Sequence, residues 1–262
     1  MKYIDIHSHL NLSPLLENQN EVIERMKEKG VATITVGTEL ATSREAVRLA
    51  EENDFLYATV GIHPNHEEEW SEELEILAQN PKVVAIGETG LDYFRNESEE
   101  SKIRQKEIFK KHIELAIKVG KPLMIHSRPS KGTMDAYEDV LEILSFYQLQ
   151  TTNYKLSANF HFFVGNVDIA KRALEAGYTM SFDGPITFSD EYDETIKFLP
   201  IDSIMAETDA PYAAPVPHRG KVCEPWMVEE VYKAIARIKG LDEEEARTTL
   251  ISNAKRFFKL DF

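Results

Sequence analysis

The chain has 262 residues, 42% of them hydrophobic, and a formal net charge of −15 at pH 7. This composition predicts a globular protein with a substantial core, and the acidity argues against broad electrostatic binding of nucleic acid, although an anionic substrate could still be held locally by metal ions and a few basic side chains. The single cysteine, Cys223, excludes an intrachain disulfide, and neither an apolar leader nor a run of about 18 apolar residues occurs, so we expect a cytoplasmic protein without membrane association.

Short apolar or β-branched runs alternate with longer amphipathic stretches along the whole chain. The predicted strands are Tyr3–His9, Ala32–Gly37, Phe55–Gly61, Val83–Glu88, Pro122–His126, Leu156–His161, Thr179–Phe182 and Ser203–Glu207. The predicted helices are Glu21–Lys29, Ser43–Asn53, Glu72–Gln79, Ser98–Val119, Asp135–Tyr147, Val167–Ala176, Asp190–Phe198, Glu224–Ile238 and Asp242–Phe257.

This rhythm predicts an α/β fold, because strands that alternate with helices form parallel βαβ units. Eight units in a chain near the roughly 250 residues typical of the fold favour a TIM-type (β/α)8 barrel, formed as a single domain by residues 1–262. An open doubly wound sheet is the alternative. Its dinucleotide-binding GxGxxG sequence is missing, since "GETG" at Gly87–Gly90 lacks that spacing.

Polar side chains gather at the predicted carboxyl ends of the strands, where the chemistry of such barrels is located. In the opening strand, alternation places His7 and His9 on one face, and Asp5 is expected to point the same way. The ends of later strands supply His63, Glu88, Asp92, His126, Arg128, His161, Glu207 and Asp209.

A histidine or carboxylate at one strand end is usually structural, and Asp92 and Glu207 could each be a helix cap or a turn residue. Several imidazoles and carboxylates converging on one rim, however, need a cation to compensate them, and they are the donor set of zinc, manganese and similar ions. The candidates outnumber the ligands of one ion. We therefore expect two divalent ions about 3.5–4 Å apart, bridged by Glu88, because the fourth strand lies between the first and the fifth.

Five segments resemble the TatD-type metal-dependent deoxyribonucleases of the amidohydrolase-like superfamily. They are "DIHSHL", "VGIHP", "IGETGLDYF", "PLMIHSR" and "ETDAPY", which span essentially the whole chain in the order typical of that family. The resemblance implies divalent-metal-dependent hydrolysis of phosphodiester bonds in DNA. It also implies one ion on His7, His9, Glu88 and Asp209, a second on Glu88, His126 and His161, and a substrate phosphate near His63 and Arg128.

Three segments depart from the family pattern. "HFFVG" at His161–Gly165 replaces HCFSG or HCFTG, "RGKVCEP" at Arg219–Pro225 lacks one basic and one amide residue, and "HSRPS" at His126–Ser130 lacks an acidic residue after the arginine. These changes concern the rim and the substrate contacts rather than the candidate ligands. They bear on the identity of the substrate more than on hydrolysis.

We therefore expect a deoxyribonuclease with two Mg, Mn or Zn ions, with Asp209 as general base, that acts exonuclease-like on strand ends. The alternative is a metal-dependent amidohydrolase or acyl-ester hydrolase, such as an aminoacyl-tRNA deacylase, on the same barrel. Glu88 favours the first, because many binuclear amidohydrolases carry a modified lysine on the fourth strand. A non-catalytic metal-binding or scaffold protein is a third interpretation. Local positive charge above the mouth would come from Arg95, Arg128, Lys131 and Arg219.

Overall fold

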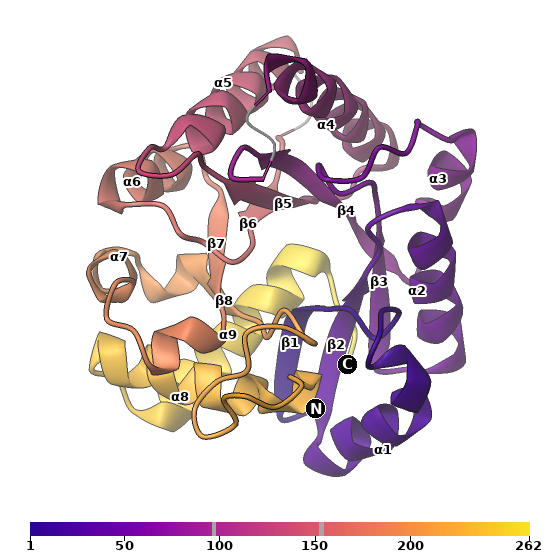
Figure 1. Cartoon of the computed structure of the whole chain (residues 1–262). Helices are drawn as coiled ribbons and strands as arrows, with labels where there is room; N and C mark the ends of the chain where they lie inside the picture. The colour runs from indigo at the N-terminus through magenta and orange to yellow at the C-terminus, as the bar shows by residue number, and fades with distance from the viewer. Residues whose placement is uncertain (96–97, 152–154) are drawn as a thin grey trace.

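The computed structural model describes residues 1–95, 98–151 and 155–262. Within these ranges the chain forms one parallel sheet of eight strands in sequence order, which curls into a nearly closed barrel surrounded by helices (Figure 1). The strands are β1 Tyr3–Ser8, β2 Val31–Val36, β3 Leu56–Val60, β4 Val83–Asp92, β5 Leu123–Arg128, β6 Ala158–Phe160, β7 Thr179–Phe182 and β8 Ile204–Ala206. The predicted (β/α)8 barrel is confirmed.

The helices follow the predicted amphipathic stretches. They are α1 Gln19–Lys29, α2 Leu40–Glu52, α3 Glu72–Leu77, α4 Glu99–Val119, α5 Asp135–Gln150, α6 Val167–Glu175, α7 Asp193–Phe198, α8 Val228–Lys239 and α9 Glu243–Phe258. In α8 the start differs from the prediction, because Pro225 opens a short 3-10 turn, Pro225–Met227, before the α-helix begins. None of the helices in the described ranges combines the length and the apolarity needed to cross a membrane.

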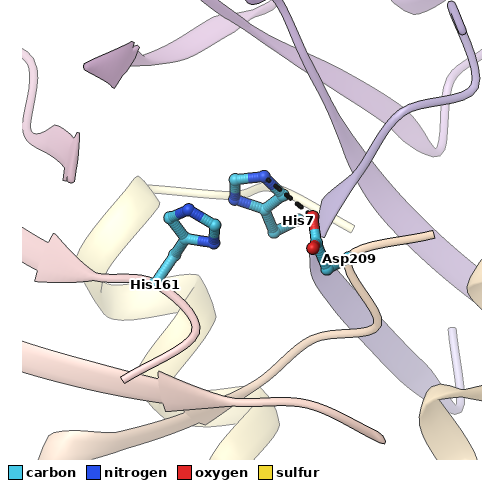
Figure 2. Close-up of side chains that lie close together, drawn as sticks. All are labelled: His7, His161 and Asp209. Carbon is cyan, nitrogen blue, oxygen red and sulfur yellow. Dashed lines mark ion pairs between the residues drawn. The ribbon is translucent and has the colours of Figure 1, made fainter. Parts of the chain in front are cut away.

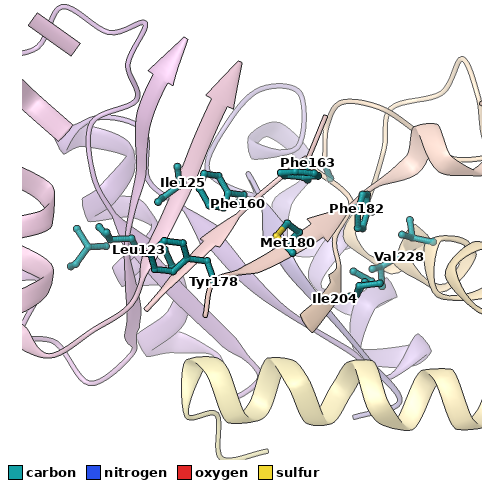
Figure 3. Packing of buried hydrophobic residues seen from close by; sticks show 14 of the residues in the cluster. Leu123, Ile125, Phe160, Phe163, Tyr178, Met180, Phe182, Ile204 and Val228 are labelled. Carbon is teal, nitrogen blue, oxygen red and sulfur yellow. The ribbon is translucent and has the colours of Figure 1, made fainter. Parts of the chain in front are cut away.

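Two apolar layers hold the barrel together. On the outer face of the strands, side chains such as Ile125, Phe160 and Phe182 pack under the surrounding helices (Figure 3). Alternation turns the neighbouring residues inward, where Ile34, Met124 and other buried side chains meet Phe258 of α9. α9 thus packs against the interior at the amino-terminal end of the barrel, and the cavity described below lies at the carboxyl ends of the strands.

The barrel closes where β1 meets the segment that follows β8. Ser8 forms an isolated parallel bridge with Ala210. The backbone N–H of His9 donates to the carbonyl of Ala210 (2.7 Å), and the N–H of Asp209 donates to the carbonyl of His7 (3.0 Å). We call residues 7–9 and 208–210 together the seam. Its backbone bonds fix three of the predicted metal ligands relative to one another.

Two strands are irregular where they carry predicted ligands. In β1, Asp5 pairs with Thr33 and Ser8 with Thr35, so the segment around His7 has one residue more than its partner strand. In β4, the segment around Glu88 likewise has one residue more than β5. Such bulges break strict alternation and redirect side chains. This is how His7 points inward directly after the inward-facing Ile6.

Candidate metal centre

The structure brings together the six predicted ligands at the carboxyl end of the barrel. They come from β1, β4 and β5 and from the segments after β1, β6 and β8, so residues far apart in the sequence meet in one cluster, three members of which are drawn in Figure 2. Figure 2 shows the rings of His7 and His161 beside each other, with Asp209 on the far side of His7; the two rings stack with their centroids 3.8 Å apart. The cluster consists of His7, His9, Glu88, His126, His161 and Asp209.

Glu88 lies at the centre, and its two carboxylate oxygens face different groups. Oε2 lies 3.5 Å from Nε2 of His7 and 3.8 Å from Nε2 of His9. Oε1 lies 2.9 Å from Nε2 of His161 and 3.0 Å from Nδ1 of His126. Asp209 completes the first group, with Oδ1 at 3.6 Å and 3.4 Å from the same two Nε2 atoms of His7 and His9.

The imidazoles present acceptor atoms to one another. Nε2 of His7 and Nε2 of His9 are 3.3 Å apart, and so are Nδ1 of His126 and Nε2 of His161. Donor atoms bound to one ion at about 2.0–2.2 Å are separated by roughly 3–3.5 Å. Both the spacing and the chemistry of the donor set therefore fit one divalent ion on each side of Glu88.

Two of the rings, those of His9 and His126, have hydrogen-bond partners on their outer nitrogens that set the tautomer. Nδ1 of His9 lies 3.2 Å from the carbonyl of Val36, and Nε2 of His126 lies 3.1 Å from Oδ2 of Asp92. Nδ1 of His161 lies 3.5 Å from Oε1 of Glu207. A neutral imidazole that uses its N–H outward keeps a lone pair on the nitrogen that faces the cluster, as a metal ligand requires.

Asp92 and Glu207 are therefore more than the cap or turn residues that the sequence allowed. Asp92 does accept the backbone N–H groups of a turn, but it also accepts from Asn65 and contacts His126. Burial alone would raise the pKa of Asp92, yet these bonds lower it and keep the carboxylate charged. Glu207 accepts from Ser181 Oγ (2.7 Å) and from the N–H of Phe162. The only sequence signal for this outer layer is its position at strand ends.

The expectation that Asp5 points with His7 and His9 is wrong. Its carboxylate accepts hydrogen bonds from the N–H (2.9 Å) and Oγ1 (2.6 Å) of Thr208, across the seam. The bulge in β1 is the physical reason, because the extra residue between Asp5 and Ser8 shifts the alternation. Asp5 thus joins β1 to the segment after β8 where the barrel closes, while His7 and His9 face the interior.

His63, predicted near the substrate phosphate, lies against the cluster itself. Its Nε2 is 3.4 Å from Oε1 of Glu88, and with Glu88 and His126 it forms a further group that could hold an ion. Burial lowers the pKa of His63 to about 3, so the ring is neutral. In Glu88, burial opposes ionisation, but His161 and His126 beside its carboxylate hold its pKa well below the usual range.

His112, on α4, holds the backbone beside His63. Its Nε2 accepts the N–H of Ile62 (2.9 Å), and its Nδ1 lies 2.8 Å from the carbonyl of Ile108. Burial lowers the pKa of His112 to about 4, which keeps Nε2 an acceptor. This ring is therefore a positioning residue for the loop that carries His63.

A cavity of about 620 Å³ opens above the cluster. Arg95, Arg128, Tyr192 and Tyr212 line its wall together with the candidate ligands, whereas Arg219 and Lys131 are not among its lining residues in the described part of the chain. Arg128, predicted near the phosphate, stacks its guanidinium 4.1 Å from the ring centroid of Phe94. The cavity thus combines a negatively charged floor with cationic and aromatic walls.

Asp183, at the end of β7, is a buried carboxyl that the sequence analysis did not single out. Its Oδ2 has no hydrogen-bond partner among the described residues. Burial raises the pKa of Asp183 well above its usual value, and the nearby Glu207 and Asp209 raise it further. Its strand-end position is the one signal that could have identified it.

Comparison with known proteins agrees with this geometry. The family model for TatD related DNases matches residues 4–259. The uncharacterized metal-dependent hydrolase YabD of Bacillus subtilis is 37% identical over 264 residues, covering 98% of this chain and 99% of its own. YcfH of Escherichia coli, also named an uncharacterized metal-dependent hydrolase, is 33% identical over 269 residues, covering 100% and 97%. Among solved structures, the TatD homologue YjjV of Escherichia coli matches with a TM-score of 0.86 at 26% identity, covering 99% of both chains.

The chain is an eight-stranded barrel with histidines and carboxylates gathered at the carboxyl ends of its strands, and it matches these relatives along its whole length. It is therefore a metal-dependent hydrolase. The names of the relatives YabD and YcfH give this class but no substrate. The chain belongs to the TatD family, as the sequence motifs predicted.

Proposed function

We propose that this protein hydrolyses phosphodiester bonds in DNA with two divalent ions. The observation that carries the proposal is the arrangement around Glu88, whose two oxygens face two separate sets of imidazoles. A shared carboxylate between two donor sets is the arrangement of two-metal phosphodiester hydrolysis. In this proposal one ion is held by His7, His9, Glu88 and Asp209, and the second by Glu88, His126 and His161.

Such ions, when bound, make water a stronger nucleophile and offset charge that develops on the phosphoryl oxygens. The chain's own residues accept the proton, orient the imidazoles and bind the phosphate. Asp209 accepts the proton of the attacking water, because its carboxylate faces the cavity beside His7 and His9. Asp92 and Glu207 keep His126 and His161 in the tautomer that faces inward. Arg128 donates hydrogen bonds to the phosphate from the cavity wall.

The acidic body favours strand ends as substrates. A net charge of −15 repels a long duplex laid across the surface, whereas the end of one strand can enter the mouth of a cavity. The enzyme in this proposal therefore shortens DNA from an end rather than cutting within closed duplexes.

The test is an activity panel. End-labelled single-stranded DNA, RNA and an aminoacyl ester are each incubated with the protein and Mg²⁺, Mn²⁺ or Zn²⁺. A ladder that shortens from one end of the DNA supports the proposal, and cleavage of covalently closed circular DNA contradicts the preference for ends. Hydrolysis of the aminoacyl ester alone would replace the proposed function with that of an acyl-ester hydrolase.

A further inference from the structure

Buried polar side chains line part of the barrel interior beneath the candidate metal centre. Asn159 on β6, Ser181 on β7 and Glu207 after β8 are each 0% exposed. Phe160 and Phe182 pack on the outer face of the same strands, so alternation turns Asn159 and Ser181 inward (Figure 3). Much of the surrounding interior is apolar, and polar groups buried there must find their partners in one another.

The hydrogen bonds among these side chains run in one direction. Oγ1 of Thr179 donates to Oδ1 of Asn159 (3.0 Å), which leaves the amide nitrogen of Asn159 facing Ser181. That Nδ2 donates to Oγ of Ser181 (2.8 Å), and Ser181 donates to Oε2 of Glu207 (2.7 Å). The single O–H of Ser181 thus goes to the carboxylate rather than to the carbonyl of Phe160 at 3.5 Å. We call Thr179, Asn159, Ser181 and Glu207 the inner network.

Glu207 connects the inner network to His161 in two ways. Its Oε1 accepts the backbone N–H of Phe162, the residue directly after His161, and lies 3.5 Å from Nδ1 of His161 itself. Phe162 has a φ of +44°, a left-handed conformation that costs free energy in a bulky residue and persists only where its surroundings hold it. The carboxylate therefore holds both the backbone turn beside His161 and the outer side of its ring.

The inner network supports one of the two sets of candidate ligands. Among the residues that the structure describes, no side-chain hydrogen bond joins it to His7, His9 or Asp209, whose contacts are with one another, with Glu88 and with the seam. Its contacts lead to His161, which shares Oε1 of Glu88 with His126. A change in the network should therefore reach one side of Glu88 first.

We propose that Ser181 and Asn159 are positioning residues for the second ion, the one assigned to Glu88, His126 and His161. They act through Glu207 and touch neither an ion nor the substrate. The inference rests on the two-ion arrangement of the proposed function and adds to it the residues that set the affinity of one ion. Groups that orient a metal-binding imidazole typically contribute about 10- to 100-fold to the affinity for the metal.

The experiment removes one hydroxyl from the inner network and measures ion binding directly. Ser181→Ala removes the donor to Glu207, and Ser181→Thr keeps a hydroxyl at the same position. The matched control is Thr59→Val, which removes a buried hydroxyl of β3 that has no hydrogen bond among the described residues. Each protein is stripped of ions with EDTA, dialysed and titrated with Mn²⁺ by isothermal calorimetry. Urea unfolding of the ion-free proteins shows whether each variant folds.

Two backgrounds assign the effect to one ion. His9→Asn leaves the second ion with its complete set of ligands, and His126→Asn leaves the first ion with its own. We expect Ser181→Ala to weaken Mn²⁺ binding about 10-fold at one of the two sites of the otherwise wild-type protein and in the His9→Asn background, but not in the His126→Asn background. Ser181→Thr and Thr59→Val should bind both ions like wild type.

Asn159→Leu tests the next step of the network with a side chain of similar size. Ser181 then keeps its acceptor but loses the donor that directs it, so its O–H can also turn to the carbonyl of Phe160. We expect a smaller loss of Mn²⁺ affinity than in Ser181→Ala. A larger loss would show that Asn159 does not act through Ser181 and would contradict the inner network.

The outcomes separate this inference from the proposed function. If Ser181→Ala binds both ions like wild type, or loses the first ion as readily as the second, the positioning role is wrong even if the protein cuts DNA. Weak binding by Ser181→Thr, or an equal loss in Thr59→Val, would attribute the effect to packing and would also overturn it. If no phosphodiester is hydrolysed while Ser181→Ala weakens the second ion alone, the proposed function is wrong and the positioning role is supported.

Discussion

Asp209 is placed by its backbone as well as by its side chain. Its φ is +55°, in the left-handed region that Asp and Asn adopt more readily than most residues. Its N–H is held by the carbonyl of His7 across the seam, so the carboxylate has little freedom to leave the cluster. Burial opposes its ionisation, but the hydrogen bond with His9 and the charge of His7 lower its pKa.

Asp209→Asn should separate a role in catalysis from a role in the turn. Asn tolerates the same backbone conformation, so the protein should fold, and the ion on His126 and His161 should remain. If Asp209 is ligand and base, turnover should fall at least about 10²-fold at saturating Mn²⁺. The control is Asp202→Asn, an exposed aspartate in the turn before β8. Near-normal turnover of single-stranded DNA by Asp209→Asn would remove this residue from the mechanism.

Asp183→Asn should stabilise the ion-free protein at neutral pH. The pKa of Asp183 is raised in the folded state above the ordinary 3.8, so above that pH the folded state binds more protons than the unfolded chain, and stability falls as the pH rises. The amide cannot ionise and avoids this loss. Urea unfolding in EDTA should show a gain of about 1–3 kcal/mol at pH 7 that shrinks toward pH 4. A variant less stable than wild type at pH 7 would contradict the expectation.

At the scale of elements, β4 depends on glycine on both sides of Glu88. Gly87 and Gly90 have φ values of +151° and +129°. A Cβ on Gly87 would lie 2.4 Å from the carbonyl oxygen of Met124, and one on Gly90 would lie 2.0 Å from that of His126. Both contacts are with the backbone of β5, which leaves no flexible atom to move aside. The two glycines of "GETG" therefore allow β4 and β5 to pack closely beside Glu88, a candidate metal ligand.

Gly90→Ala should disturb the second ion more than the first. The new methyl group must push β5 away at His126, and we expect a loss of roughly 3 kcal/mol or more in the free energy of unfolding. Gly120→Ala is the matched control, because Gly120 also has a positive φ of +68° but nothing lies near its added Cβ. That change should cost only about 1–2 kcal/mol. Elemental analysis should find fewer ions in Gly90→Ala alone; equal ion content in both variants would contradict this account.

The elements were predictable because their signals are local. A strand such as β5 is a continuous apolar run that ends in His126, and its helix partners show regular amphipathic spacing. Asp5 was wrongly predicted to point inward with His7 and His9. The extra residue in β1 that changes its direction depends on pairing with β2, and no local sequence pattern indicates it. The roles of Asp92, Glu207 and Asp183 depend on which strand ends become neighbours, which only the closed barrel determines.

At the scale of the whole molecule, the candidate ligands come from strands around most of the barrel. Ions bound there would connect β1, β4 and β5 with the segments after β6 and β8. A ligand that binds only the folded state stabilises it by about 2.7 kcal/mol at 100 times its dissociation constant. Each kcal/mol shifts the Tm of a domain near this size by roughly 2–4 °C.

Chelation should therefore lower the Tm by about 5–10 °C, and Mn²⁺ should restore it. Reloading should weaken as the pH falls, because the pKa of His161 is raised: burial opposes its protonation, but Glu88 and Glu207 favour it, and a proton then competes with the ion for Nε2. Differential scanning calorimetry with elemental analysis of the same samples checks this. An unchanged Tm after verified loss of ions would contradict the structural role.

The seam also sets an order in time for a chain made from its amino terminus. Thr208 meets Asp5 across 203 residues of sequence, so His7 and His9 are synthesised long before the carboxylate that shares their side of the cluster. Glu88, His126 and His161 lie closer together in the chain and are all complete once the ribosome has passed β6. The residues proposed for the two ions are thus translated in order, and the set that contains the first histidines is the last to be completed.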